Sequence, residues 1–312
     1  MRLLALLTTL CTITILCTCQ QNSYGYGLHS GLSTLNQSQY ASRIPQKAKR
    51  TIRRHAGTLG PRRPLVIPDT PAPTPNCAAV CVIDPFNGHI LYAHNAHTRR
   101  QVASTQKLIT ALCVCDAGDL DKMVTIKASD CKAPPIRLNL KPGQEYRKRD
   151  LLLAMLTGSF NDVALTLARD TAGSVDAFVD RMNARARRMR MYNTHFANPN
   201  GLPAAQYSTA HDMALAACYA YNNRTIRNYV SIPEYDFTRA DGRARRIRST
   251  NRLIYQYPWV NGMKTGYTNA AGKCLVSSAT MNGRAVIVVV LGSTSRRIWG
   301  ESLKYLQWAL GI

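Results

Sequence analysis

The sequence predicts an α+β fold, in which strands from both ends of the folded region form an antiparallel sheet and helices lie between them. Apolar strand-like runs occur near residue 80 and after residue 270, and helical periodicity occupies the residues between them. Hydrophobic residues make up 46% of the 312 residues and charged residues 18%, which is enough apolar surface for a sizeable core. Wholesale disorder and a fibrous repeat are therefore excluded.

Residues 1–19 predict a secretory signal peptide. Met1-Arg2 precedes an apolar run from Leu3 to Leu16, which is shorter than the roughly 20 residues that a membrane span requires. The end of this segment also resembles a lipoprotein cleavage box, with Cys19 as the residue that would carry the lipid. Both interpretations place the mature protein outside the cytoplasm, in the periplasm or cell envelope, in a soluble or a lipid-anchored form.

Residues 20–76 predict a basic, proline-rich, disordered linker. Hydrophobic residues show no helical or strand-like periodicity in this segment. The stretch from Arg43 to Arg63 contains eight basic residues and no acidic residue. A solvated spacer and an electrostatic tether to an anionic surface are both consistent with this composition. The predicted folded domain then covers residues 77–312.

The folded domain begins with a predicted β-hairpin. Ala78 to Ile83 and His89 to Ala93 have the composition of strands, and the turn signal Asp84-Pro85-Phe86-Asn87-Gly88 separates them. Helical spacing of apolar residues follows in three segments: 104–116, 149–156 and 162–171. The middle of the domain is therefore predicted to be helical.

A second hairpin and a closing helix are predicted at the end of the chain. Lys273 to Thr280 and Arg284 to Leu291 flank Met281-Asn282-Gly283, and Asn-Gly favours the turn that matches the twist of paired strands. Arg296 to Leu310 then shows the apolar spacing of a helix that packs on a core.

Ser104-Thr105-Gln106-Lys107 is a Ser-x-x-Lys motif at the start of a predicted helix. This spacing stacks two side chains on one helical face, so the hydroxyl and the amine are expected to touch. A lysine can act as the base for a serine when burial and a nearby cation lower its pKa. Lowering the pKa of a lysine from about 10.4 to about 7.5 requires roughly 4 kcal/mol, and a second lysine nearby would supply part of it.

The chain contains a second copy of this motif, Ser129-Asp130-Cys131-Lys132. It runs into Ala133-Pro134-Pro135, and because proline disrupts helical hydrogen bonding, Ser129 and Lys132 are expected not to share a helical face. Taken alone, Ser104 is more often an ordinary helix N-cap than a nucleophile. Two further motifs change that balance.

Ser159-Phe160-Asn161 lies in the short connection between two predicted helices, and Lys264-Thr265-Gly266 follows the predicted strand Trp259 to Met263. Each motif is weak alone, since Ser-x-Asn recurs at Ser249-Thr250-Asn251, but Lys-Thr-Gly occurs only once. Together, Ser-x-x-Lys on a helix start, Ser-x-Asn in a loop and Lys-Thr-Gly on a strand match the constellation of penicillin-binding proteins and class A β-lactamases.

With these residues, the chain resembles the low-molecular-mass penicillin-binding proteins of the D-alanyl-D-alanine carboxypeptidase family. The likeness covers roughly residues 78–310 and includes the opening hairpin and the segments 159–164, 193–196, 201–202, 208–213 and 262–268. Family members commonly have a small residue where this chain has Phe160, so the lip of the pocket is expected to differ. The implied fold is β-lactamase/transpeptidase-like, with an antiparallel sheet flanked by helices and a mostly helical subdomain.

The resemblance implies catalytic roles for four residues. Ser104 would be the nucleophile and Lys107 its base. Ser159 would relay the proton to the departing amine, and Asn161 would hold both Lys107 and the substrate amide.

The resemblance also implies how the substrate is held. Lys264, beside Thr265, would bind the terminal carboxylate of the substrate and keep Lys107 neutral by like-charge repulsion. Gly266 would let the strand lie against the substrate. The backbone N–H groups of Ser104 and Tyr267 would form an oxyanion hole, in which each donor is worth roughly 3 kcal/mol.

The implied activity is that of a serine-type D-alanyl-D-alanine carboxypeptidase, which removes the terminal D-alanine from peptidoglycan stem peptides through an acyl-enzyme and needs no cofactor. β-Lactams would be covalent inhibitors. They should not be destroyed rapidly, because no glutamate is followed four residues later by the asparagine found in class A β-lactamases. A D,D-endopeptidase that cuts peptidoglycan cross-links and a non-catalytic cationic protein that binds penicillin or the wall both stay open as alternatives.

Other patterns indicate neither a metal site nor a nucleic-acid site. His94 and His97 flank a predicted loop without a nearby carboxylate, which favours exposed loop histidines, and the seven cysteines after the signal peptide are buried thiols or form one or two disulfides. The arginine-rich runs 181–190 and 239–252 lack a nucleic-acid-binding motif. With the net charge of +23, they favour an anionic surface of the cell envelope as a partner over nucleic acid.

Overall fold

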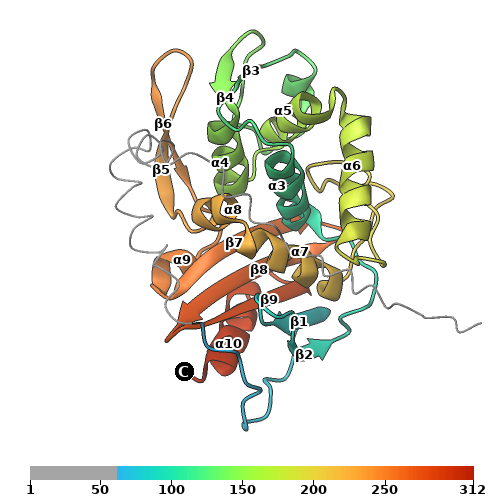
Figure 1. The fold of residues 1–312 in the computed structure, drawn as a ribbon, viewed down its shortest axis with the longest axis vertical. Coiled ribbons are helices and arrows are strands. Elements are labelled where there is room, and N and C mark those ends of the chain that lie inside the picture. Colours follow the sequence, from blue (N-terminus) through green and yellow to red (C-terminus); the bar gives the residue numbers. More distant parts are fainter. Residues whose placement is uncertain (1–61) are drawn as a thin grey trace, which may run out of the picture. The chain divides into compact units, whose positions relative to one another are not determined.

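One antiparallel sheet joins the two ends of the folded chain, as predicted. Its strands are β1 (Ala79–Ile83), β2 (Ile90–His94), β7 (Val260–Thr268), β8 (Gly272–Met281) and β9 (Arg284–Ser293), in the order β2-β1-β9-β8-β7. The N-terminal hairpin therefore pairs with the C-terminal one through β1 and β9 (Figure 1). The computed structural model describes residues 62–312, so the predicted signal peptide and the linker up to residue 61 lie outside the described residues.

Helices cover both faces of this sheet. Side chains alternate along a strand, so Val286, Val288 and Val290 of β9 pack with α10 (Ile298–Leu310) on one face. Ile287 and Val289 point to the other face and belong to the larger core beneath α7 (Ala210–Asn222). Burial on both faces explains why β9 has an almost uninterrupted apolar sequence.

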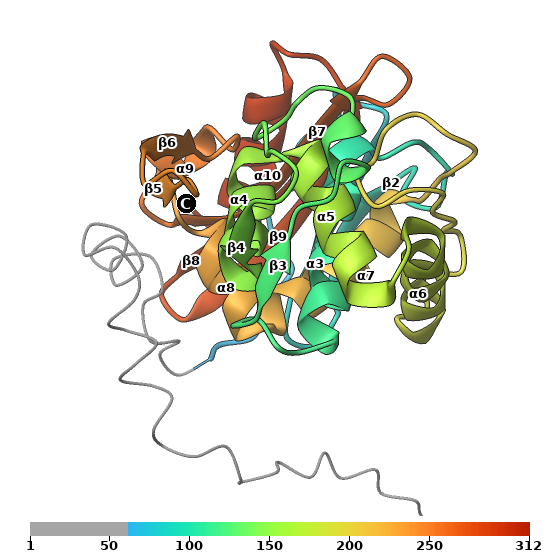
Figure 2. The same ribbon diagram turned by 90° about the horizontal axis from the view of Figure 1, so that it is seen from above.

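The remaining elements form the predicted, mostly helical region on the α7 side of the sheet (Figures 1 and 2). Its helices are α3 (Lys107–Asp116), α4 (Lys148–Gly158), α5 (Asn161–Ala172), α6 (Val175–Arg188) and α8 (Arg224–Val230). The short α9 (Leu253–Gln256) lies by β7, and its Leu253 belongs to the core on the α10 side. Two small hairpins were not predicted: β3 (Met123–Thr125) with β4 (Glu145–Arg147), and β5 (Glu234–Thr238) with β6 (Ala244–Arg248). Within residues 62–312, no helix has both the length and the apolarity needed to cross a membrane.

The predicted linker boundary at residue 76 needs correction, because residues 63–76 pack on the folded domain. Leu65 is buried, and its N–H donates to the Asp84 carboxylate over 3.1 Å. Three side chains of α10 donate to carbonyls of this segment: Trp308 to Thr70, Tyr305 to Pro73 and Lys304 to Thr74. An extended proline-rich chain leaves its carbonyls free to accept such bonds, so a composition typical of a linker is compatible with a docked segment.

Candidate active site

The first motif brings a serine and a lysine into direct contact. Ser104 lies in the 3₁₀ turn η1 (Ala103–Gln106), and Lys107 begins α3, so the predicted helix start is split between two helix types. Residues three apart eclipse one another in a 3₁₀ turn. The Lys107 Nζ lies 2.8 Å from the Ser104 Oγ, which confirms the predicted contact.

Lys107 is fully buried among acceptors. Besides Ser104 Oγ, its Nζ contacts Asn161 Oδ1 at 2.9 Å and the Asn200 carbonyl at 2.6 Å. Burial, together with the charge of Lys264, holds the pKa of Lys107 well below its usual value. A neutral amine beside a serine hydroxyl can take its proton, so the geometry and the pKa both suit a general base.

Asn200 is a site residue that the sequence did not single out. Its carbonyl accepts from both Lys107 and the Ser104 hydroxyl, the latter over 3.1 Å. The next residue, Gly201, has a φ of +83° and packs so closely that a Cβ there would lie 2.2 Å from the Ala103 carbonyl. The glycine is required for this approach, and it was the one available signal for the segment.

The second motif forms the junction between α4 and α5. Ser159 ends α4 in the left-handed conformation, with φ of +64°, and Asn161 begins α5. Ser159 Oγ accepts from Lys264 Nζ over 2.8 Å, while Asn161 Oδ1 accepts from Lys107. The junction therefore directs both polar side chains toward the lysines.

Phe160 does not form part of a pocket lip, contrary to the expectation from the sequence. The ring is only 5% exposed and belongs to the main core, and the Arg245 guanidinium lies 5.1 Å from its centroid. A Cβ at Gly158 would lie 2.3 Å from the Phe160 ring, so this chain accommodates the bulky residue by having glycine two positions earlier.

The third motif lies on β7, which is an edge strand of the sheet. Lys264 is buried, and its Nζ donates to Ser159 Oγ and, over 3.0 Å, to the Thr265 carbonyl. Burial lowers the pKa of Lys264 to about 7. The site thus contains two lysine–serine pairs, Lys107 with Ser104 and Lys264 with Ser159.

Gly266 brings β7 against Ser104. A Cβ at this position would lie 2.8 Å from the Ser104 nitrogen and 3.0 Å from the Thr105 nitrogen, so only glycine permits the approach. The next residue, Tyr267, has a side chain that is 55% exposed and lies under the Lys273 ammonium at 4.0 Å. Thr265 Oγ1 donates to Thr250 Oγ1 over 2.6 Å.

The second copies of the Ser-x-Asn and Ser-x-x-Lys motifs lie in different places. Ser249-Thr250-Asn251 lies beside the site, because Thr250 contacts Thr265 and the Asn251 amide donates to the Gly262 carbonyl over 2.7 Å. Ser129 and Lys132 are exposed and lie in a second 3₁₀ turn, η2 (Asp130–Lys132). The prediction that they do not share a helical face was wrong, because Ser129 precedes η2 in helical conformation and the chain becomes extended only at Ala133, just before the prolines.

Other candidate residues have structural partners away from this site. Glu145 contacts Thr125, Glu234 pairs with Arg246 and Arg248, and Glu301 pairs with Lys304. His211 contacts Asp212 and lies against the His97 ring. The seven cysteines of residues 62–312 are all free thiols, and this part of the chain contains no group of three or more side chains suited to a metal ion.

Comparison with known proteins agrees with this geometry. The family model for D-alanyl-D-alanine carboxypeptidases, peptidase family S11, matches residues 69–295. The chain is 33% identical to the D-alanyl-D-alanine carboxypeptidase DacF of Bacillus subtilis over 238 residues, which are 73% of this chain and 60% of that protein. It is 34% identical to a D-alanyl-D-alanine endopeptidase of Pseudomonas aeruginosa over 214 residues, which are 67% of this chain and 69% of the relative.

Solved structures show the same fold. The D-alanyl-D-alanine carboxypeptidase of Mycobacterium tuberculosis superposes with a TM-score of 0.74 at 30% identity, over 79% of this chain and 96% of that one. The Streptomyces K15 DD-transpeptidase gives a TM-score of 0.72 at 29% identity, over 78% of this chain and all of its own. The chain therefore belongs to the D-alanyl-D-alanine carboxypeptidase family of serine peptidases.

Proposed function

We propose that this protein is a serine D,D-carboxypeptidase that removes the terminal D-alanine from peptidoglycan stem peptides. One observation carries the proposal: Lys107 Nζ contacts both Ser104 Oγ and Asn161 Oδ1, while Lys264 Nζ contacts Ser159 Oγ. The three motifs of the sequence thus meet in one buried polar cluster. Such a substrate lies outside the cytoplasm, in keeping with the predicted signal peptide.

Acylation begins at Ser104. Neutral Lys107 takes the hydroxyl proton while Oγ attacks the carbonyl of the penultimate D-alanine. The N–H groups of Ser104 and Tyr267 stabilise the oxyanion, an assignment supported by the close approach of Gly266 to the Ser104 nitrogen. Ser159 passes the proton from Lys107 to the nitrogen of the leaving D-alanine as the peptide bond breaks.

Lys264 and Thr265 hold the terminal carboxylate of the substrate. In the enzyme without substrate, burial lowers the pKa of Lys264 to about 7. The carboxylate of a bound substrate favours the charged form of this lysine. A charged Lys264 then disfavours protonation of Lys107. The negative charge of the bound carboxylate offsets part of this effect, so burial is the main cause of the low pKa of Lys107.

Deacylation transfers the acyl group to water, with Lys107 as the base. The three glutamates of the described chain have partners elsewhere, so a water near the acyl carbonyl lacks the dedicated carboxylate of a class A β-lactamase. β-Lactams should therefore persist as acyl-enzymes, because the opened ring stays attached and obstructs the path of water.

We also propose that the C-terminal end of α6 faces an anionic polymer of the cell envelope. Within residues 62–312, Arg181, Arg187 and Arg188 form no ion pair, whereas Arg185 pairs with Asp116. The other arginine-rich segment, β5–β6, is largely neutralised, because Arg243, Arg246 and Arg248 pair with acids of the same hairpin. The two segments look alike in sequence, but the hairpin arginines that lack an acid partner, Arg239 and Arg245, donate to the Leu138 carbonyl, whereas Arg181, Arg187 and Arg188 of α6 are exposed without an ion pair in the described part of the chain.

The activity is tested on purified muropeptides analysed by mass, with nitrocefin as the comparison substrate. We expect loss of one D-alanine from pentapeptide stems, and a turnover of nitrocefin slower than that of the peptide. Cleavage of cross-linked dimers in preference to D-alanine release would favour the endopeptidase activity that one relative carries in its name. Faster turnover of nitrocefin would favour a β-lactamase.

The nucleophile is tested by penicillin labelling of two serine variants. Ser104→Ala should abolish the acyl adduct seen by mass spectrometry, because within residues 62–312 Ser104 is the serine that Lys107 contacts. Ser129→Ala is the matched control, since it changes the serine of the exposed Ser-x-x-Lys copy and should label normally. Labelling of the Ser104 variant and not of the Ser129 variant would overturn the assignment.

The carboxylate role of Lys264 is tested by pairing Lys264→Ala with a substrate whose terminal carboxylate is amidated. The variant should lower kcat/KM at least tenfold, because a charge-assisted hydrogen bond is worth about 1.5–3 kcal/mol. Amidation should lower activity strongly in the wild type and add little further loss in the variant. An equal effect of amidation in both proteins would show that Lys264 does not read the carboxylate.

The α6 surface is tested by retention on purified sacculi at low salt. Replacement of Arg181, Arg187 and Arg188 by glutamine should weaken retention, while activity on a small soluble peptide stays unchanged. Replacement of Arg243, Arg246 and Arg248 by glutamine removes the same charge from the neutralised hairpin and should have a smaller effect. Equal loss in the two variants would show that net charge alone decides retention.

A further inference from the structure

The loop between η2 and β4 lies directly beside the catalytic cluster. We call residues 133–140 the rim loop. The backbone N–H of Asn161 donates to the Ile136 carbonyl over 2.8 Å, and the Asn161 amide donates to the Pro135 carbonyl over 2.9 Å. The same Asn161 side chain accepts from Lys107, so the rim loop and the general base are joined through one residue.

The rim loop is held from two sides. The Asp162 carboxylate of α5 accepts from the backbone N–H groups of Leu138, Asn139 and Leu140 over 2.9 to 3.3 Å. Arg245 of the β5–β6 hairpin donates to the Leu138 carbonyl over 2.7 Å. These bonds engage the backbone of Leu138, Asn139 and Leu140, in addition to the carbonyls of Pro135 and Ile136.

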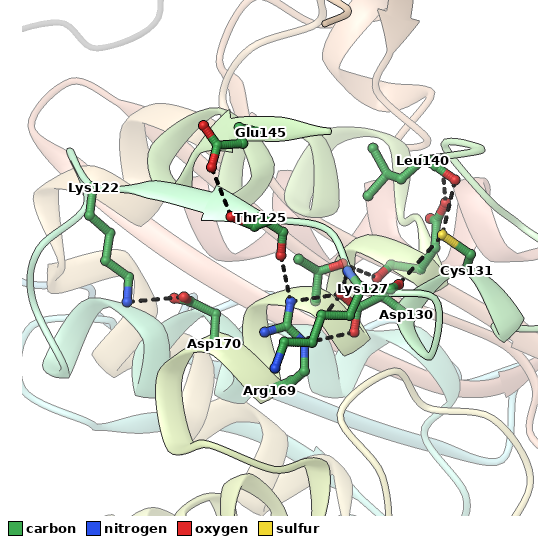
Figure 3. Close-up of polar contacts among 11 residues, drawn as sticks. Lys122, Thr125, Lys127, Asp130, Cys131, Leu140, Glu145, Arg169 and Asp170 are labelled. Atoms are coloured by element: carbon green, nitrogen blue, oxygen red, sulfur yellow. Dashed lines mark hydrogen bonds and ion pairs between the residues drawn. The ribbon is translucent and has the colours of Figure 1, made fainter. Parts of the chain in front are cut away.

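The approach to the loop is fixed as well (Figure 3). Arg169 of α5 binds both carboxylate oxygens of Asp130, and the Cys131 thiol lies 3.1 Å from the Leu140 carbonyl. The first contact secures η2 to α5, and the second joins η2 to the end of the loop. A loop with this many anchors presents its side chains in one fixed arrangement.

Apart from the two exposed prolines, Ile136 is the one apolar residue of this loop that is not buried. Its side chain is 59% exposed, whereas Ala133, Leu138 and Leu140 are buried. Single exposed apolar residues are ordinary on a protein surface, but this one lies on anchored backbone bonded to Asn161. A β-branched side chain is also stiff, so it loses little conformational freedom when a ligand packs on it.

We propose that Ile136 is a specificity-determining residue that packs on the aliphatic part of the substrate, N-terminal to the scissile bond. The inference rests on the proposed function and adds one step to it: the Asn161 amide, which donates to the Pro134 carbonyl over 3.3 Å, donates instead to the carbonyl of the substrate amide that precedes the penultimate D-alanine. The group attached to that amide then lies next to Ile136. An acyl group with several methylenes buries part of the Ile136 side chain, whereas an acetyl group is too short to do so.

The test compares two peptides, N-acetyl-D-alanyl-D-alanine and N-hexanoyl-D-alanyl-D-alanine, on the full-length enzyme. Ile136→Ala should raise KM for the hexanoyl peptide about threefold to tenfold, since each buried methylene is worth about 0.8 kcal/mol and the contact is partial. kcat for both peptides and KM for the acetyl peptide should stay within about twofold. Ile136→Leu should restore most of the lost affinity.

Met123→Ala is the matched control, because Met123 is 50% exposed on β3 and has no contact with the motifs. The Met123→Ala variant should have the same KM and kcat as the wild type for both peptides. If Ile136→Ala changes KM for both peptides equally, or changes KM for neither, the inference is overturned and the proposed function stays intact. A wild-type enzyme that releases D-alanine from neither peptide and is not acylated by penicillin would instead reject the proposed function, and this inference with it.

Discussion

Burial of two lysines in one polar cluster is the constraint on which the site depends. Desolvation disfavours the charged form of each, and it lowers the pKa of Lys264 to about 7 and holds that of Lys107 well below its usual value. The unfolded chain therefore binds more protons than the folded one between the ordinary lysine pKa and pH 7, so Lys264 makes the protein less stable as the pH falls through that range. The loss of stability is consistent with the proposed mechanism, which requires a neutral amine beside Ser104.

The architecture supplies acceptors for both lysines from three segments outside β7. The η1 turn brings Ser104, the α4–α5 junction brings Ser159 and Asn161, and the segment before Gly201 brings the Asn200 carbonyl. The edge strand β7 can lie against Ser104 only because Gly266 has no side chain. The sheet and the helical region therefore meet at the cluster, and neither part contains the site alone.

The sequence predicted the sheet and the motifs because both depend on local patterns. Alternating apolar residues, an Asn-Gly turn and three short motifs are all visible without knowledge of the fold. Asn200, the rim loop and Thr250 were missed because they act through backbone carbonyls or through contacts between distant segments, and the one available signal among them was Gly201 beside Asn200. The docking of residues 63–76 was missed for a related reason, since proline-rich sequence is compatible both with a free linker and with a segment whose carbonyls bind α10.

The central claim is that burial and the charge of Lys264 keep Lys107 a neutral base. NMR titration of lysines labelled at Cε and Nζ tests this claim most directly. The Lys107→Met and Lys264→Met variants assign the two resonances. We predict that the Lys107 resonance titrates well below the ordinary lysine range. In Lys264→Met its pKa should rise, because the like charge is gone while burial remains. A Lys107 that titrates near pH 10.4, or whose pKa does not respond to Lys264→Met, would contradict the account.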